Sequence, residues 1–327
     1  MHSGDRMPEH RKSRLRRWYL PCLVLLTALA ASEAAAWSEK PFDPKAGSRW
    51  LIVSELDRTE TRVENGRRSM VALKKITRTE LVFNAKLPDG GYRISFTRRA
   101  TVASGDPREA ALARIEGETM NNVAIRAVTD RNGKPLRVEN LDEILARRKE
   151  LVDRLATTVD AETAAVARRM LEGLTKVSDV EATRQLTDME MLAMAQNSGL
   201  RPGETRNSTL ESPSGIGPPL VKSREFSILQ TDAATGNALM LLKESYTEES
   251  MREFLAVITR RSLGPGKATD ERESDMRRMK MSLDNRFEIG VADGMSRSLD
   301  ATSTTSSDLL GNTMVIKDQR KVRISPL

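Results

Sequence analysis

The chain has 327 residues, a formal net charge of +7, and only 4% aromatic residues. Its one cysteine, Cys22, and its two histidines, His2 and His10, all lie within the first 36 residues. If that segment is removed, disulfides, thiolate or imidazole zinc sites, and Ser-His-Asp or Cys-His catalytic machinery are all excluded.

Residues 1–36 have the three parts of an export signal. Residues 11–17 are basic, and the apolar run 20–31 is shorter than the about 20 residues that span a bilayer. Ala34 and Ala36 fit the small-x-small cleavage pattern, which makes Trp37 the expected mature start. We expect a periplasmic or secreted protein without a transmembrane segment in the mature chain. A retained membrane anchor is the alternative.

Removing this segment lowers the net charge to +4, because residues 1–36 carry six Lys and Arg against three Asp and Glu. Nucleic-acid readers usually show clustered positive charge and use aromatic side chains for base stacking. The mature chain has only two Trp, two Tyr and six Phe. We therefore expect no nucleic-acid partner, and no cofactor or metal site is indicated.

Residues 50–103 predict antiparallel β-strands. Within 92–102, apolar residues such as Ile94 and Phe96 alternate with polar ones, which is typical of a strand with one buried face. The turn 88–91 joins this strand to 81–87, and Asn65-Gly66 predicts another hairpin turn.

Asp106, Pro107 and Glu109 predict the start of a short helix that Gly117 ends. A second hairpin, 123–128 with 136–138, is expected across the turn 130–133. A calcium loop is the alternative for that turn, but the remaining ligands of the 12-residue pattern are missing.

Residues 140–198 are expected to be helical, with Asn140 and Glu143 as a capping box. The last helix of this segment contains many methionines, which predicts burial more than adaptable partner binding. Residues 199–222 are rich in Gly, Pro and Ser and predict a linker or a segment lying along the surface.

The rest of the chain again predicts strands, with one helix capped by Thr247. The strands expected before that helix are 226–230 and 238–243. Those expected after it are 276–283, 287–291, 296–304, 312–316 and 322–324. Asp284-Asn285 and Asp293-Gly294 are the expected turns.

These elements predict an α+β fold in which two antiparallel β-meander regions flank a central helical segment. The expected divisions are a signal peptide at 1–36, an N-terminal β-meander region at 37–139, a helical segment at 140–198, a linker at 199–222, and a C-terminal β-rich region at 223–327. One large domain or two smaller ones fit the length.

Several phrases together carry a resemblance: LPDGGYRISFTRRA, DRNGKPLRVENLDEI, RPGE followed by PPLVKSREFSIL, TGNALMLL and FEIGVADGMSRSLDATS. In this layout the chain resembles bacterial exported proteins of unknown function with paired β-meanders around a helical centre. The resemblance implies no activity and transfers no functional residue.

The function expected is non-enzymatic binding of an amphiphile, such as a lipid, or of another envelope component. A concave sheet closed by helices would hold the ligand, by analogy with half-barrel lipid carriers. One alternative is a structural or protein-interaction role in the envelope. Another is a carboxylate-dependent hydrolase, which would need two facing carboxylates with raised pKa values.

Overall fold

A computed structural model describes residues 39–157, 198–212, 218–263, 279–309 and 311–327, together with 161, 164–165 and 168. The expected signal peptide, with its cleavage residues Ala34, Ala36 and Trp37, lies outside the described residues, as does nearly all of the helical segment after 157. Within the described ranges no helix is both long and apolar enough to cross a membrane.

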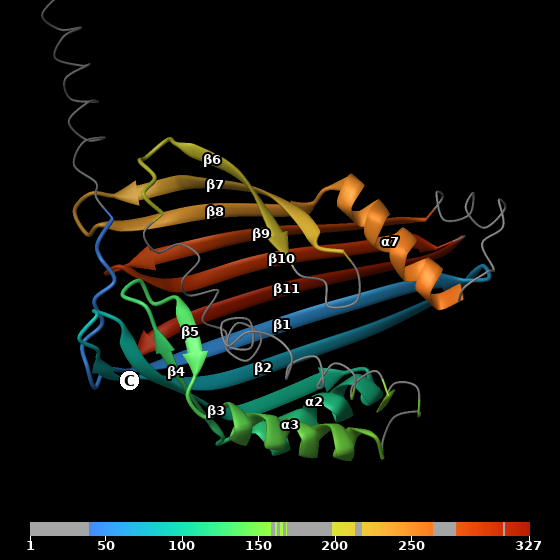
Figure 1. The fold of residues 1–327 in the computed structure, drawn as a ribbon, viewed down its shortest axis with the longest axis horizontal. Coiled ribbons are helices and arrows are strands. Elements are labelled where there is room, and N and C mark those ends of the chain that lie inside the picture. Colours follow the sequence, from blue (N-terminus) through green and yellow to red (C-terminus); the bar gives the residue numbers. More distant parts are fainter. Residues whose placement is uncertain are drawn as a thin grey trace, which may run out of the picture.

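Eleven antiparallel strands form one sheet in the order β5-β4-β3-β2-β1-β11-β10-β9-β8-β7-β6 (Figure 1). The first five are β1 (Arg49–Glu64), β2 (Arg67–Lys86), β3 (Tyr92–Gly105), β4 (Ala124–Thr129) and β5 (Pro135–Val138). The other six are β6 (Thr205–Ser212), β7 (Leu220–Asp232), β8 (Asn237–Tyr246), β9 (Lys280–Ala292), β10 (Met295–Leu309) and β11 (Asn312–Pro326). Within β1–β5 and within β6–β11, strands that are consecutive in sequence are neighbours in the sheet; β1 pairs with β11, and the consecutive strands β5 and β6 form the two opposite edges.

The expected α+β arrangement, with two meander regions flanking a central helical segment, is wrong. The first and last strands pair over their whole length, from Trp50 opposite Pro326 to Val63 opposite Thr313. Backbone groups of both strands are satisfied by this pairing, which leaves neither meander with a free edge at the junction. The two meanders are therefore halves of one sheet, and the helices lie on its face.

Three helices are described: α2 (Pro107–Met120), α3 (Leu141–Leu155) and α7 (Glu248–Leu263). Figure 1 shows α7 crossing the sheet on the same side as α2 and α3. We call this side the inner face; it carries alternate residues of every strand, such as Ile52 and Lys75. The outer face carries the residues between them, such as Asp57 and Lys74.

The predicted hairpins at 64–67, 88–91 and 130–133 are confirmed, and so is the turn at Asp293-Gly294. Two other predicted breaks are wrong. Strand β9 runs through Asp284 and Asn285 because both residues pair on both sides, with β8 and with β10. Likewise β11 is one strand where two were expected, since β1 and β10 pair with it along its length.

The expected linker at 199–222 contains a strand. Residues Thr205–Ser212 form β6, which pairs with β7 and makes one edge of the sheet. Gly117 also differs from expectation, because α2 continues past it to Met120. A Cβ on Gly117 would lie 2.8 Å from the Cβ of Thr101, so glycine here allows the helix to pack closely on β3.

The main core lies on the inner face at one end of the sheet. It includes Leu81, Phe83, Tyr92 and Ile94 from one half of the sheet. From the other half it includes Met240, Ile289, Val291 and Leu299. Ile94 and Phe96 are buried as the alternation predicted, but Val102, expected on the same face, is exposed because the β2–β3 register shifts between Arg78 and Thr79.

The segment before β1 covers this end of the core. Phe42 is buried and makes edge-to-face contacts with Phe83 and Tyr92, at centroid distances of 5.8 and 5.3 Å. The backbone of Gly47 donates to the carbonyl of Phe83, and the amide of Phe83 donates to Ser48. The segment before β1 is thus part of the core.

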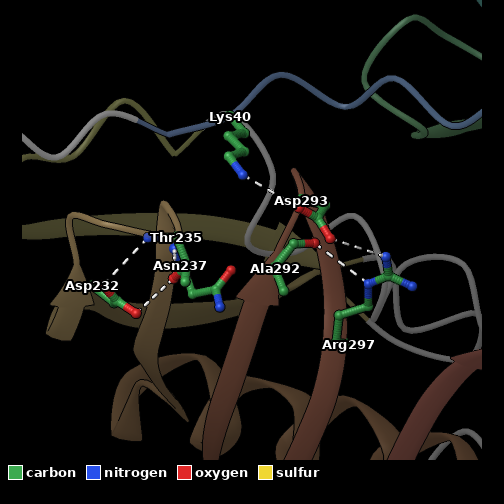
Figure 2. A network of polar contacts seen from close by, with 7 residues as sticks. All are labelled: Lys40, Asp232, Thr235, Asn237, Ala292, Asp293 and Arg297. Carbon is green, nitrogen blue, oxygen red and sulfur yellow. Dashed lines mark hydrogen bonds and ion pairs between the residues drawn. The ribbon is translucent and has the colours of Figure 1, made fainter.

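Polar contacts fix the same segment to the β9–β10 turn (Figure 2). Lys40 reaches Asp293 at 3.3 Å, and Asp293 also faces Arg297 at 3.7 Å. Gly294 has a φ of 71° and lies so close to Pro41 that a Cβ would be 2.2 Å from the proline carbonyl oxygen. Only glycine satisfies both the left-handed turn and this close approach.

Phe42→Ala is expected to lower the free energy of unfolding by about 3–5 kcal/mol, the usual loss for a buried phenylalanine. Lys45→Ala, at an exposed position of the same segment, is the matched control and is expected to change it by less than about 0.5 kcal/mol. Urea denaturation of both variants measures the difference. Equal stability of the two would show that the segment does not belong to the core.

Candidate functional site

The inner face changes from apolar to charged along its strands. At the end covered by Phe42 it is apolar, but toward the middle charged residues occupy inward-facing positions. One row across the sheet shows the change: Phe226, Leu242, Phe287, Ala301, Arg320, Leu56 and Lys75 lie opposite one another from β7 to β2. The row is apolar over four strands and then carries cations on β11 and β2.

A basin of about 380 Å³ lies at the cationic end of this row. Its polar lining consists of Ser54, Arg58, Lys75, Thr77, Arg98, Ser303, Asp318 and Arg320. Its apolar lining consists of Leu56, Phe287 and Ala301. Strands β9, β10, β11, β1, β2 and β3 all contribute, so the basin spans the junction between the first and last strands.

Two of the cations are fixed across the β1–β11 pair. Arg58 donates from Nε and Nη2 to the two carboxylate oxygens of Asp318, at 2.8 and 2.7 Å. Arg320 donates from Nε to the hydroxyl of Ser54 at 2.9 Å. A bidentate arginine–carboxylate pair has a defined geometry, so Arg58 and Asp318 form a rigid wall of the basin.

The other two cations share one carboxylate of α2. Glu116 accepts from Lys75 Nζ at 2.5 Å and from Arg98 at 2.8 Å. The helix is set in place by Asp106, whose side chain accepts from the backbone N–H groups of Arg108 and Glu109. The capping prediction for Asp106 is confirmed, and the helix that it begins presents Glu116 to the inner face.

Burial on its own would raise the pKa of Glu116. The positive charges of Lys75 and Arg98, and the hydrogen bonds from them, outweigh that effect and lower the pKa to about 2. Glu116 is therefore ionised at neutral pH and holds α2 to β2 and β3 by a three-residue ion cluster.

A fifth cation lies behind this cluster. The Nε of Arg148, on α3, is buried and has no hydrogen-bond partner in the described part of the chain. Burial lowers the pKa of its guanidinium, while the charge of Glu116 opposes that change. Positive charge therefore accumulates around Glu116 from three elements, β2, β3 and α3.

The lining has four cations and one carboxylate, an excess of three positive charges. Glu116 reduces this excess to two, and Glu60 and Glu109 act on Arg58 from farther away. Three hydroxyl side chains add neutral hydrogen-bonding groups. This combination of donors suits an anion, and the neighbouring Leu56, Phe287 and Ala301 suit an apolar group attached to it.

The pairs that a carboxylate hydrolase would need are not found among the described residues. Each described carboxyl group with a resolved shift, namely Asp43, Glu80, Glu116 and Asp232, has a lowered pKa. A general acid needs the opposite shift. Across the described ranges, no three His, Cys, Asp or Glu side chains are grouped to hold a metal ion.

Sequence reasoning did not find the basin. Its candidate residues Ala34, Ala36 and Trp37 concern signal cleavage and lie outside the described residues. The sequence did contain a usable signal. Arg58 lies two residues after Leu56, and Lys75 two residues after Leu73, so each cation is on the same face of its strand as an inward-facing leucine. Charged residues on the inward-facing side of a strand indicate either the edge of the core or a binding site.

A scan against protein-family models finds none that matches this chain, and a search of the curated proteins finds no match either. The function is therefore argued from the geometry of the basin.

The lowered pKa of Glu116 predicts acid sensitivity. Stability from this group is fully present above the ordinary pKa of 4.5 and is lost as pH falls toward about 2. Glu116→Gln is expected to cost about 3 kcal/mol at pH 7 and to reduce the loss of stability between those pH values.

Glu118→Gln is the matched control, two residues farther along α2. Glu118 pairs with Arg154 at the surface and is expected to contribute less than about 1 kcal/mol. Denaturation curves from pH 2 to pH 7 compare the three proteins. If the free energy of unfolding depended on pH in the same way in wild type and in Glu116→Gln, the lowered pKa of Glu116 would be contradicted.

Proposed function

We propose that this is an exported, non-enzymatic binding protein whose basin takes the anionic head of an amphiphile. The observation that carries the proposal is the amphipathic row across the inner face. Arg320 and Lys75 supply positive charge at one end, and Phe226, Leu242, Phe287 and Ala301 form an apolar path away from it.

The dimensions of the row suit a ligand whose head group lies in the basin and whose apolar chain extends across the strands toward β7. Strands β7 and β11 are four spacings apart in the sheet, which is about 19 Å at about 4.8 Å per spacing. A hydrocarbon chain lying across the strands would contact the partly exposed Ala301 and Phe287 while its head group reached Arg320, and it would reach Phe226 by passing over the buried Leu242. Apolar contact along the path and charge-assisted hydrogen bonds at its end both favour binding.

Arg320→Ala is expected to weaken binding of a fluorescent fatty acid at least about 10-fold, because one charge-assisted hydrogen bond is lost. Lys321→Ala is the matched control: it removes a cation one residue away, on the outer face of the same strand, and is expected to change affinity less than about 2-fold. Fluorescence titration measures both.

The methyl ester of the same probe lacks the carboxylate charge, so it separates the contribution of charge to affinity from that of apolar contact. It is expected to bind more weakly than the acid to wild type and equally to wild type and Arg320→Ala. Circular dichroism confirms that the variants remain folded. Equal losses for Arg320→Ala and Lys321→Ala, or no binding of the acid to folded wild type, would refute the proposed function.

The proposal of export has its own test. Cleavage after Ala36 is expected to give a mature chain beginning at Trp37, because the sequence combines a basic segment, a short apolar run and a small-x-small site. N-terminal sequencing of protein recovered from a bacterial host's periplasm determines the start. A mature chain that keeps residues 1–19 would contradict cleavage.

A further inference from the structure

The outer face of β2 combines exposed cations with exposed apolar residues. Its outward-facing residues are Arg68, Met70, Ala72, Lys74, Ile76 and Arg78, and all six are exposed. The strand thus presents three basic and three apolar side chains on its outer side, where a solvated strand usually presents polar ones.

The apolar members are far from buried. Met70 is 66% exposed, and Val102, on β3, is 62% exposed. Ile76 is 39% exposed and lies directly opposite Val102 in the β2–β3 register. These side chains belong to neither core cluster of the described chain, so their exposed apolar area is available to a partner.

Charge on the outer face is unevenly distributed between the two halves of the sheet. On β1, β2 and β11 the outward-facing cations are Arg49, Arg68, Lys74, Arg78, Lys317, Lys321 and Arg323, against the carboxylates Glu55, Asp57 and Glu80. On β8, β9 and β10 they are Lys243, Lys280 and Arg286, against Asp284, Glu288, Asp300 and Asp308. Among these strands the positive excess is on β1, β2 and β11, beside the exposed Met70 and Ile76 of β2.

Several of these cations make no close ion pair within the described part of the chain. They are Arg68, Arg78, Lys317 and Lys321, although Lys321 lies opposite Glu55 on β1 and Asp300 on β10 in the strand register. By contrast, Lys74 faces Asp57 at 3.3 Å, and Arg323 faces Asp300 at 2.9 Å. Unpaired surface cations beside exposed apolar groups are typical of surfaces that contact anionic lipid.

We propose that the outer face of β1, β2 and β11, with Val102 of β3, docks on an anionic membrane surface. The four unpaired cations attract the lipid phosphates, and Met70, Ile76 and Val102 enter the boundary between head groups and acyl chains. The surface lies on the opposite side of the sheet from the basin, so docking leaves the inner face free. This inference is independent of the proposed function.

Co-sedimentation with phosphatidylglycerol vesicles tests the inference, using the chain from Trp37 onward. Binding is expected to be strong at low salt, to weaken as salt increases, and to be absent with phosphatidylcholine vesicles. Arg78→Gln with Lys321→Gln is expected to weaken binding about 30-fold, about 5-fold for each cation. Met70→Ser with Val102→Ser is expected to weaken it further, with little change in salt dependence.

Lys243→Gln with Arg286→Gln is the matched control. It removes the same net charge from the other half of the outer face and is expected to weaken binding less than about 3-fold. Equal weakening by the two charge pairs would show that only net charge matters and would overturn the proposal. So would equal binding to phosphatidylcholine, or a dimer seen by light scattering that Met70→Ser with Val102→Ser abolishes, since the face would then be a self-interface.

Discussion

The pairing of β1 with β11 is the constraint on which the rest of the molecule depends. It joins residues about 260 positions apart in sequence, such as Arg58 and Asp318, and turns two meanders into one sheet. Contacts this distant carry a large loop-closure cost and are expected to form late in folding. Each half must therefore be held partly in place by its own hairpins before the two strands meet.

The register of that pairing also creates the basin. Because side chains alternate strictly along a strand, a slip of one residue would move Arg58 and Arg320 to opposite faces and separate Arg58 from Asp318. The apolar pair Ile52–Ile324 and the buried Val322, opposite Ser54, lie farther along the same strands and fix the register from the core side. Binding chemistry and core packing are therefore determined by one alignment of two strands.

Side chains alternate between the two faces of the sheet, and the two faces accommodate their charges in different ways. The inner face buries apolar residues at one end and holds its central charges by pairing them, as Glu116 does with Lys75 and Arg98. Unpaired, those charges would be costly to bury. The outer face needs no such pairing because water solvates its charges. Unpaired cations there are tolerated wherever they lie, so their concentration on β2 and β11 is not required by the fold.

Local features of the fold could be predicted from the sequence, and the arrangement of the site could not. Asn65-Gly66 and the alternation around Phe96 are determined by neighbours in the chain, so the hairpins and the buried face were predicted correctly. Asp284 and Asn285 are residues typical of turns, but pairing with β8 and β10 keeps them extended. Glycine is typical of helix ends, but at position 117 the close packing of α2 on Thr101 explains its presence better.

The basin required knowledge of which strands are neighbours. Arg58 and Lys75 belong to one hairpin, so their proximity follows from local pairing, while Arg320 and Asp318 come from the last strand and Glu116 from a helix. No local pattern specifies that these segments meet. A charge on the inward side of a strand shows that a counter-charge must exist, since burial without one is too costly, but only the β1–β11 register identifies Asp318 as that partner. Arg58, Lys75 and Arg98 each obey this logic, so their part of the basin follows from which segments are neighbours and not from any motif.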